Sequence, residues 1–230
     1  MARSIPPDRL VRLVECATEV FIERGYRRTQ MADVADALGV AKGTLYLYVE
    51  SKEALFDLVA RSADAPPLTT LPALPIRTPK RGATLGYVRE RIAKNQAPAA
   101  LVGALRKSRG RATRAELEGI VRELYDAVAR NRRGIKLLDR SARDHPELAA
   151  LWFEGARDGL IRLLGEYLAN RSARQLLRPV PDAAVTARLV IETVVFWAVH
   201  RHWDPHPQAV DESTARETVV RFIVDALAKE

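Results

Sequence analysis

The chain has 230 residues, 47% of them hydrophobic, a length that suits one or two domains and a composition that allows a packed core without cross-links. Its single cysteine, Cys16, excludes an internal disulfide framework and a cysteine-based zinc cage, and fits a reducing compartment. The N-terminus has no apolar signal segment, and the most apolar run (189–199) is short and contains Glu192. We therefore expect a cytoplasmic protein that does not associate with membranes.

The formal net charge of +8 favours a polyanionic partner, but the charge is unevenly distributed along the chain. Residues 1–60 contain 8 Lys and Arg against 9 Asp and Glu, whereas residues 77–143 contain 18 against 6. The positive excess thus lies outside the first sixty residues. Net charge alone does not identify that segment as a nucleic-acid binder.

Helical periodicity dominates the sequence, and no alternating strand pattern or Asn-Gly turn is evident, which predicts an all-α fold. Asp8 is expected to cap a first helix that Gly25 stops, and Thr29 to cap a second helix that closes at Gly39. Ser51 is expected to cap a later helix. The first helix carries an apolar stripe of Leu10, Leu13, Val14, Ala17, Val20 and Phe21.

The stretch VADALGVAKGTLYLYVESKEAL (34–55) places a glycine between two helical patterns. Gly39 can adopt the left-handed conformation that redirects the chain, and residues 39–42 have the length of a helix-turn-helix linker. In the short second helix, Leu45 and Val49 are four residues apart and can both face the core. The residues then expected on its other faces are Lys42, Gly43, Thr44, Tyr46 and Tyr48.

These remaining residues have the chemistry needed to meet a DNA duplex. Lys42 and Thr44 lie at a helix N-terminus, where free N–H groups favour a phosphate or a base edge. Gly43 allows close backbone approach, and the two tyrosine hydroxyls and the Lys52 ammonium could contact phosphate oxygens. The alternative is that Tyr46 or Tyr48 belongs to the core, as aromatic residues on short helices often do.

The order of residues across 29–55 closely resembles the signature of the tetracycline-repressor (TetR) family of bacterial transcription regulators. The matching positions are Thr29, Val34, Ala35, Gly39, Val40, Lys42, Gly43, Thr44, Leu45, Tyr46, Ser51, Lys52, Glu53 and Leu55. The resemblance covers residues 8 to about 60, and the later helices agree only in number and order. It implies a three-helix DNA-binding domain with its recognition helix at 42–48.

By this resemblance, DNA contacts fall on Gln30, Lys42, Gly43, Thr44, Tyr46, Tyr48 and Lys52. Gln30 stands where the family often has a second threonine. Two departures leave operator preference open. Ala41 replaces the usual serine N-cap, a loss of about 0.5–2 kcal/mol for a short helix, and Tyr48-Val49 replaces the usual His-Phe ending.

The proline-rich stretch APPLTTLPALPIRTP (65–79) cannot continue a helix and predicts a boundary between domains. We expect a DNA-binding domain at 1–64, a connector at 65–82, and a larger helical effector-binding and dimerisation domain at 83–230. Amphipathic segments in the last of these predict helices near 84–107, 113–142, 146–172, 183–202 and 209–228.

Residues 183–199 are apolar nearly all round, which implies burial on two sides. Together with 217–227 they resemble the last two helices of the family, which form a four-helix bundle between two copies. The alternative is a helix buried wholly within its own chain. A homodimer has a functional reason, because two recognition helices about 34–36 Å apart read a palindromic operator in double-stranded DNA.

The resemblance implies a small-molecule effector, whose identity the sequence does not give. The expected pocket residues are aromatic, with core packing as the alternative: Tyr125, Trp152, Phe153, Tyr167 and Trp197. The basic run RKSRGRATR (106–114) could favour an acidic effector, touch flanking DNA or form a solvated face.

No cofactor, metal site or catalytic site is expected. His200 and His202 are two apart and do not share a helical face, and no nucleophile motif lies near Asp144 and His145. The prediction is a sequence-specific transcriptional regulator, a repressor released by a small molecule, and not an enzyme. The alternatives are an activator and a helical regulator that responds to a partner protein.

Overall fold

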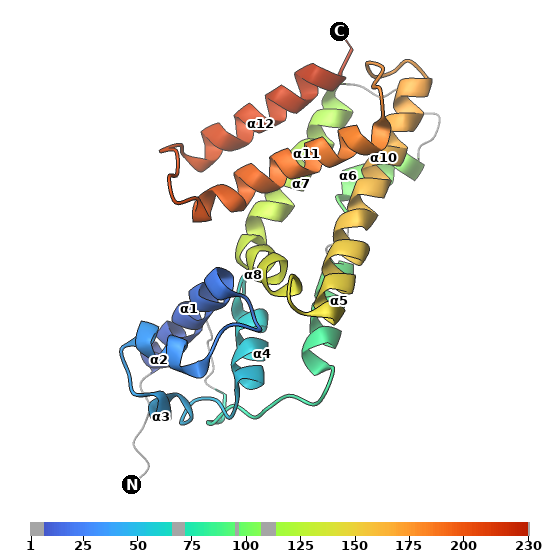
Figure 1. The fold of residues 1–230 in the computed structure, drawn as a ribbon. Coiled ribbons are helices and arrows are strands. Elements are labelled where there is room, and N and C mark those ends of the chain that lie inside the picture. Colours follow the sequence, from blue (N-terminus) through green and yellow to red (C-terminus); the bar gives the residue numbers. More distant parts are fainter. Residues whose placement is uncertain (1–6, 66–71, 95–96, 107–113, 230) are drawn as a thin grey trace. The chain divides into compact units, whose positions relative to one another are not determined.

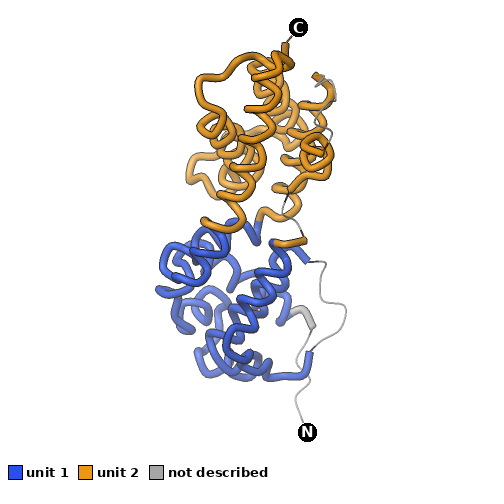
Figure 2. Tube along the Cα trace, turned by 90° about the vertical axis from the view of Figure 1, so that its right-hand side faces the viewer, with its two compact units in different colours: residues 1–92, 133–152 blue, residues 93–132, 153–230 orange. Residues whose placement is uncertain are grey.

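The computed structural model describes residues 7–65, 72–94, 97–106 and 114–229, and these are helical apart from connecting segments and isolated β-bridges (Figure 1). The chain divides into two compact units (Figure 2). Unit 1 comprises residues 1–92 and 133–152, and unit 2 comprises 93–132 and 153–230. The all-α prediction is confirmed, whereas the domain boundaries predicted from composition stay predictions.

Unit 1 begins with α1 (Pro7–Arg24), α2 (Met31–Leu38), α3 (Lys42–Leu45) and α4 (Lys52–Ser62). It continues with most of α5 (Ala83–Lys94) and α8 (Arg132–Ala142), and with α9 (Pro146–Ala149). Aromatic rings pack together in its core: the centroid of the Phe56 ring lies 5.2 Å from that of Phe21 and 4.7 Å from that of Tyr26. Aromatic pairs at such distances add about 0.5–1.5 kcal/mol to the burial of apolar area.

Two of the expected helix caps are wrong, and one is confirmed. Helix α1 begins at Pro7, one residue before Asp8, so Asp8 is inside the helix. The N-cap of α2 is Gln30, because the Thr29 hydroxyl instead donates to the Gly25 carbonyl at 2.7 Å and Thr29 is buried. Ser51 caps α4 as expected, since its hydroxyl accepts a hydrogen bond from the Ala54 amide at 3.1 Å.

Unit 2 contains α6 (Ala99–Arg106), α7 (Arg114–Arg130), α10 (Asp158–Ala173), α11 (Ala183–Ala198) and α12 (Glu212–Leu227). Helix α10 continues from a π-helical segment (Ala150–Arg157), and a 3₁₀ turn (His200–Trp203) follows α11. The side chains of Asp182 and Asp211 cap α11 and α12 by accepting amide hydrogen bonds at 2.8 and 2.9 Å.

Two of the long helices expected from periodicity are each divided. The segment 84–107 forms α5 and α6, and Pro98, directly before α6, cannot donate the hydrogen bond that a continuous helix needs. The segment 113–142 forms α7 and α8, which meet at Asn131. There the Asn131 side chain donates to the Ala127 carbonyl at 2.8 Å, offering that carbonyl a partner outside the helical ladder.

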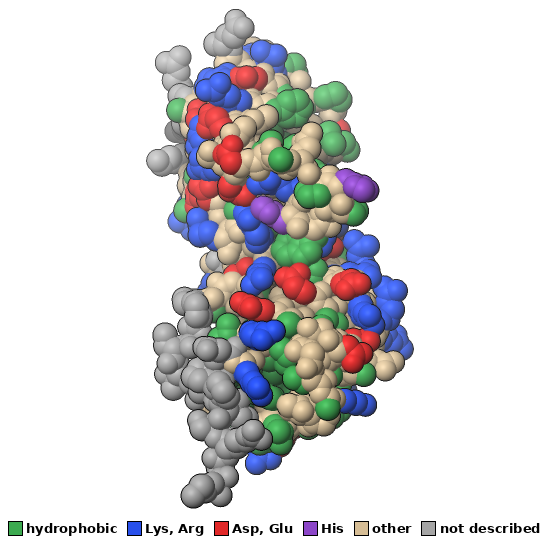
Figure 3. Space-filling view, turned by 90° about the vertical axis from the view of Figure 1, so that its left-hand side faces the viewer, with side chains coloured by type: hydrophobic (Ala, Val, Ile, Leu, Met, Phe, Trp, Pro, Cys, Tyr) green, Lys and Arg blue, Asp and Glu red, His purple; other side chains and the backbone are tan. Residues whose placement is uncertain are grey.

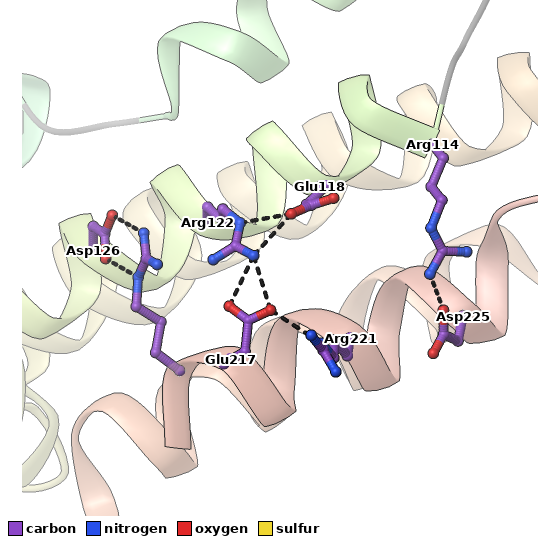
Figure 4. Close-up of polar contacts among 8 residues, drawn as sticks. Arg114, Glu118, Arg122, Asp126, Glu217, Arg221 and Asp225 are labelled. Carbon is purple, nitrogen blue, oxygen red and sulfur yellow. Dashed lines mark hydrogen bonds and ion pairs between the residues drawn. The ribbon is translucent and has the colours of Figure 1, made fainter. Parts of the chain in front are cut away.

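Ion pairs join α7 to α12 along one side of unit 2 (Figure 4). Arg122 bridges Glu118 on its own helix and Glu217 on α12, both at 2.8 Å. Arg216 reaches back to Asp126 with two hydrogen bonds of 2.6 Å. Since partly exposed pairs contribute about 0–1 kcal/mol each, they fix the register of the two helices more than they stabilise the unit.

Charged side chains of both signs are interspersed over the face drawn in Figure 3, so neither sign covers it alone. Within the described part of the chain, no helix is both long and apolar enough to span a bilayer.

Candidate nucleic-acid interface

The turn between α2 and α3 has the geometry expected from the sequence. Gly39 has φ +72°, in the left-handed region, and its amide and that of Val40 donate to the carbonyls of Asp36 and Ala35 at 3.1 and 3.0 Å. A Cβ atom at Gly39 would meet nothing within 4 Å, so the backbone conformation and not crowding explains the glycine. The turn closes α2 and starts α3 in a new direction.

Helix α3 is only four residues long, and it presents a mixed polar and apolar surface. Lys42 and Gly43 are exposed and Thr44 is half-buried, while Leu45, with no exposed surface, anchors the helix in the core. The exposed fraction of Tyr46, which follows the helix, is 43%. The structure thus brings together most of the predicted DNA contacts in one short stretch.

Leu47 is a surface residue that sequence reasoning left out. Its side chain is 60% exposed, next to Tyr46. Gln30, the residue before α2, is exposed as well. Leu47 lies in the turn after α3 and not in the helix, so helical periodicity gave no signal for it.

The expectation that Tyr48 faces away from the core is wrong. Its side chain is only 3% exposed, and Val49 beside it is fully buried. The reason is that α3 ends at Leu45, three residues earlier than predicted, so residues 46–48 form a turn instead of continuing the helical rotation. A DNA contact by the Tyr48 hydroxyl stays a prediction.

The Lys52 ammonium is held by the protein itself. It donates to the backbone carbonyls of Tyr26 and Thr29 at 3.1 Å and of Arg27 at 3.3 Å, and it lies 4.7 Å from the centre of the Tyr26 ring. The Tyr26 hydroxyl donates to Glu53 at 3.2 Å. Burial, reinforced by the Glu53 carboxylate, raises the pKa of Tyr26 to about 12, so the ring stays neutral beneath the ammonium. Lys52 therefore fastens the α1–α2 loop to the start of α4.

Ala41 stands at the N-cap of α3, as expected, with an extended backbone and no side-chain hydrogen bond. The residue is exposed, and its methyl group cannot accept a hydrogen bond from the first turn of α3 as a serine hydroxyl would. One backbone bond, from the Thr44 amide to the Ala41 carbonyl at 2.8 Å, defines the turn. The free amides at this end of α3 are left for solvent or a ligand.

Sequence reasoning missed a second segment beside α3. The Ile76 amide donates to the Tyr48 carbonyl at 2.8 Å, and the Glu50 amide donates to the Ile76 carbonyl at 3.0 Å, forming an isolated parallel bridge between Val49 and Ile76. Figure 1 shows this segment passing α3 before it reaches α5. The prolines around it predicted only a connector, and no local pattern could reveal a backbone pairing across 27 residues.

The five predicted effector residues fall into two groups. Tyr125 and Tyr167 are almost completely buried in unit 2, and their hydroxyls donate to Glu212 and Glu116 at 3.1 Å. Burial and the neighbouring carboxylate raise the pKa of Tyr125 to about 12, and raise that of Tyr167 as well. These two are packed core residues. The half-buried group consists of Trp152, Phe153 and Trp197.

Most of the basic run at 106–114 lies outside the described residues. Its two described ends, Arg106 and Arg114, are exposed, and Arg114 pairs with Asp225 on α12 (Figure 4). Its predicted contact with effector or DNA stays a prediction.

Glu212, the first residue of α12, is the centre of a polar cluster in unit 2. It accepts from Tyr125 at 3.1 Å, from Arg132 at 2.9 Å and from Arg201 at 2.7 Å, and lies 3.4 Å from Nε2 of His202. Burial opposes ionisation of Glu212, but the surrounding donors hold its pKa below the usual range. Burial, together with Arg132 and Arg201, lowers the pKa of His202. His202 is thus part of a cluster of arginine side chains around the Glu212 carboxylate.

Comparison with characterised proteins bears on the N-terminal region. Residues 13–59 match the family model described as bacterial regulatory proteins, tetR family. The chain is 42% identical over 53 residues to the HTH-type transcriptional repressor KstR2 of Rhodococcus jostii (strain RHA1), covering 23% of this chain and 26% of that protein. It is 42% identical over 43 residues to the fatty acid metabolism regulator protein of Bacillus subtilis (strain 168), covering 19% and 22%. The matches thus span about a quarter of these relatives.

Solved structures extend the likeness in fold over the whole chain. KstR2 of Mycobacterium tuberculosis aligns with a TM-score of 0.54 at 19% identity, covering 99% of this chain and 98% of that one. SCO3833 of Streptomyces coelicolor A3, a member of the TetR transcriptional regulator family, aligns with a TM-score of 0.53 at 23% identity, covering 94% and 91%. Residues 13–59 thus resemble the helix-turn-helix of the tetR family of bacterial regulatory proteins, and the whole chain is similar in fold to these two structures.

Proposed function

We propose that the protein is a sequence-specific DNA-binding transcriptional repressor that acts as a homodimer and is released from its operator by a small molecule. The observation that carries this proposal is the exposed surface of α3 directly after the left-handed turn at Gly39. The similarity of this region to named transcriptional repressors supports it.

In this proposal, α3 enters the major groove of double-stranded DNA. Lys42 and the free amides at the start of α3 meet a phosphate, Gly43 allows close approach, and Thr44 contacts a base edge or phosphate. Tyr46 offers its hydroxyl to the backbone, and Gln30 contacts phosphate or an adjacent base from the start of α2. Each of these residues except the half-buried Thr44 is exposed.

Lys52 and Tyr48 take a different role from the one their sequence positions imply. Because the Lys52 ammonium already donates to three carbonyls, we assign it to holding the α1–α2 loop, and with it the position of α2 and α3. The Tyr48 side chain is buried in the turn that follows α3, so we assign it to the packing of this region. Direct contacts by these two residues are secondary in the proposal.

The second copy is proposed to pack on α11 and α12. The large exposed hydrophobic side chains of the described residues fall in two places. Tyr46 and Leu47 form the first, and the second lies on α11 and α12: Val185, Leu189, Phe196 and Phe222. Exposed apolar side chains grouped on neighbouring helices are typical of association surfaces. A dimer would cover them and double the number of base pairs read.

Effector binding is proposed for unit 2, and the identity of the small molecule is left open. Of the predicted pocket residues in that unit, Phe153 and Trp197 are half-buried and thus have surface to offer a ligand, whereas Tyr125 and Tyr167 are already hydrogen-bonded in the core. A ligand that favours the DNA-free arrangement would release the operator by shifting the population between two states.

The test is selection of genomic fragments by the purified protein at two salt concentrations, followed by sequencing. We expect enrichment of one palindromic sequence and sub-micromolar binding at physiological salt. A reporter gene under that operator should be less active when the protein is present. Weak binding that shows no sequence preference and vanishes at higher salt would contradict the proposal.

A further inference from the structure

Residues 76–81 form a segment, here called the strap, that is fastened to the exit of α3. Besides the two backbone bonds between Ile76 and residues 48–50, the Thr78 amide donates to the Glu50 carboxylate at 2.8 Å. The hydroxyls of Ser51 and Thr78 also lie 2.8 Å apart. Backbone, side-chain and charged contacts thus hold the start of the strap against the α3–α4 turn.

The other end of the strap is fastened as well. The Lys80 carbonyl accepts from the Ala83 amide at 2.9 Å, and Gly82, with φ +81°, turns the chain into α5. In the first turn of α5, the Thr84 hydroxyl donates to Asp57 of α4 at 2.8 Å. Lys80 and Arg81 therefore lie between two anchors, at residues 48–51 and at Asp57.

The strap carries three cations whose side chains face solvent. The Arg77 side chain is 82% exposed and pairs with Glu50. Lys80 and Arg81 are exposed, and neither forms an ion pair with any residue in the described ranges. Lys80 and Arg81 lie four and five residues past Ile76, so at most ~18 Å of extended chain separates them from the bridge to Val49, just after α3. That distance is shorter than the ~34 Å of one helical turn of DNA.

The position of the strap supplies positive charge that the first sixty residues lack. Residues 1–60 contain 8 Lys and Arg against 9 Asp and Glu, although phosphate neutralisation supplies much of the affinity for DNA. The strap adds three cations and no anion beside α3. Arg77 also neutralises Glu50, which would otherwise present a negative charge next to the DNA backbone.

We propose that the strap is a second DNA-contacting element, in which Lys80 and Arg81 bind backbone phosphates flanking the half-site read by α3. This inference rests on the proposed function and adds a contact site outside the helix-turn-helix. Arg77 makes a smaller contribution, because its charge is shared with Glu50. Since phosphates carry no sequence information, the strap adds affinity and register without changing which bases are preferred.

The experiment compares the dependence of operator binding on salt in the wild type and in a Lys80→Gln/Arg81→Gln double variant. Each phosphate contact contributes about 0.9 to the slope of log K against log salt concentration. We expect the slope to become shallower by about 1.8, and the affinity near 0.15 M salt to fall on the order of 10- to 30-fold. Discrimination between the operator and a mismatched site should not change. Ethylation of flanking phosphates should interfere with wild-type binding and less with binding of the double variant.

Two further variants separate direct contact from other effects. Arg162→Gln/Lys229→Gln removes the same charge from exposed positions in unit 2 and should leave the slope nearly unchanged. Lys80→Arg/Arg81→Lys keeps both charges and should retain wild-type binding. Thermal unfolding of each variant confirms that the fold is kept.

An unchanged slope in Lys80→Gln/Arg81→Gln would overturn the inference while leaving the proposed function intact. An equal loss in the unit 2 control would also overturn it, because the effect would then be one of net charge alone. If the wild type enriches no sequence from genomic DNA, the proposed function fails and the strap inference fails with it.

Discussion

The Lys52 ammonium lies 4.7 Å from the centre of the Tyr26 ring while donating to three backbone carbonyls of the α1–α2 loop. A lysine that the sequence motif places among DNA contacts is therefore also the fastening of the helix-turn-helix. The two roles can be separated, because a phosphate contact depends on salt and an internal hydrogen bond does not.

Lys52→Met should reduce the free energy of unfolding by about 2 kcal/mol, because hydrogen bonds to a charged group are worth about 1.5–3 kcal/mol and the methionine stem keeps the packing. Operator affinity should fall with the slope of log K against log salt unchanged. The measurements are chemical denaturation and binding titrations at several salt concentrations. Lys42→Met is the matched variant, and it should keep its stability while the slope becomes shallower by about 0.9. If Lys52→Met instead kept the wild-type stability and made the salt slope shallower, Lys52 would be a phosphate contact.

Ala41→Ser should stabilise α3, because a serine hydroxyl at this extended, exposed N-cap can accept a free amide of the first turn. The expected gain is about 0.5–2 kcal/mol, measured by denaturation, together with tighter operator binding from a better-ordered helix. Ala37→Ser, an exposed change inside α2, is the control and should give no gain. A loss of binding in Ala41→Ser would indicate that Ala41 touches the duplex closely.

Glu50→Ala should loosen the strap without unfolding unit 1. The carboxylate accepts from the Thr78 amide and pairs with Arg77, and these bonds lower the pKa of Glu50. Hydrogen exchange at the Thr78 and Ile76 amides should accelerate, whereas exchange in α1 should not change. Glu15→Ala, an exposed change in α1, serves as control. Identical protection of the two strap amides in both variants would show that the backbone bridge holds the strap unaided.

Leu189→Glu should convert the proposed dimer to monomers, because the side chain is 63% exposed on α11 and a buried carboxylate without a partner is costly at an interface. Sedimentation or light scattering measures the change, and circular dichroism should show the helix content retained. Operator binding should weaken greatly, since one half-site is read alone. Arg162→Glu on α10 is an exposed control that should remain dimeric. If Leu189→Glu has the same mass in solution as the wild-type dimer, the exposed face of α11 and α12 is not the dimer interface.

Stability should depend on pH through His202. Its pKa is lowered from the ordinary value of 6.5 by burial and by Arg132 and Arg201, with Glu212 opposing. The unfolded chain therefore binds a proton more readily than the folded chain, and the free energy of unfolding should fall as pH drops through 6.5. His202→Gln should show a weaker decline between pH 7.5 and 5.5, measured by denaturation at each pH. If the free energy of unfolding declined equally with falling pH in the wild type and in His202→Gln, His202 would not be the group responsible.

Local patterns were sufficient for several features whose deciding interaction joins residues close in the chain. The left-handed turn at Gly39, the Ser51 cap of α4 and the missing cap at Ala41 each follow from a few neighbouring residues. The same reasoning failed for Tyr48, because α3 ends at Leu45 and residues 46–48 form a turn, so helical periodicity does not place this side chain. It also failed for Thr29, whose hydroxyl bonds backward to Gly25.

The sequence by itself determined the helical class and the helix-turn-helix, because each depends on periodicity or on the conformational freedom of single residues. Only the tertiary structure decided that Lys52 is bound to the α1–α2 loop and that the strap pairs with the exit of α3. Both interactions join residues more than twenty positions apart. Such contacts form only when packing brings distant segments together, and no local pattern encodes them.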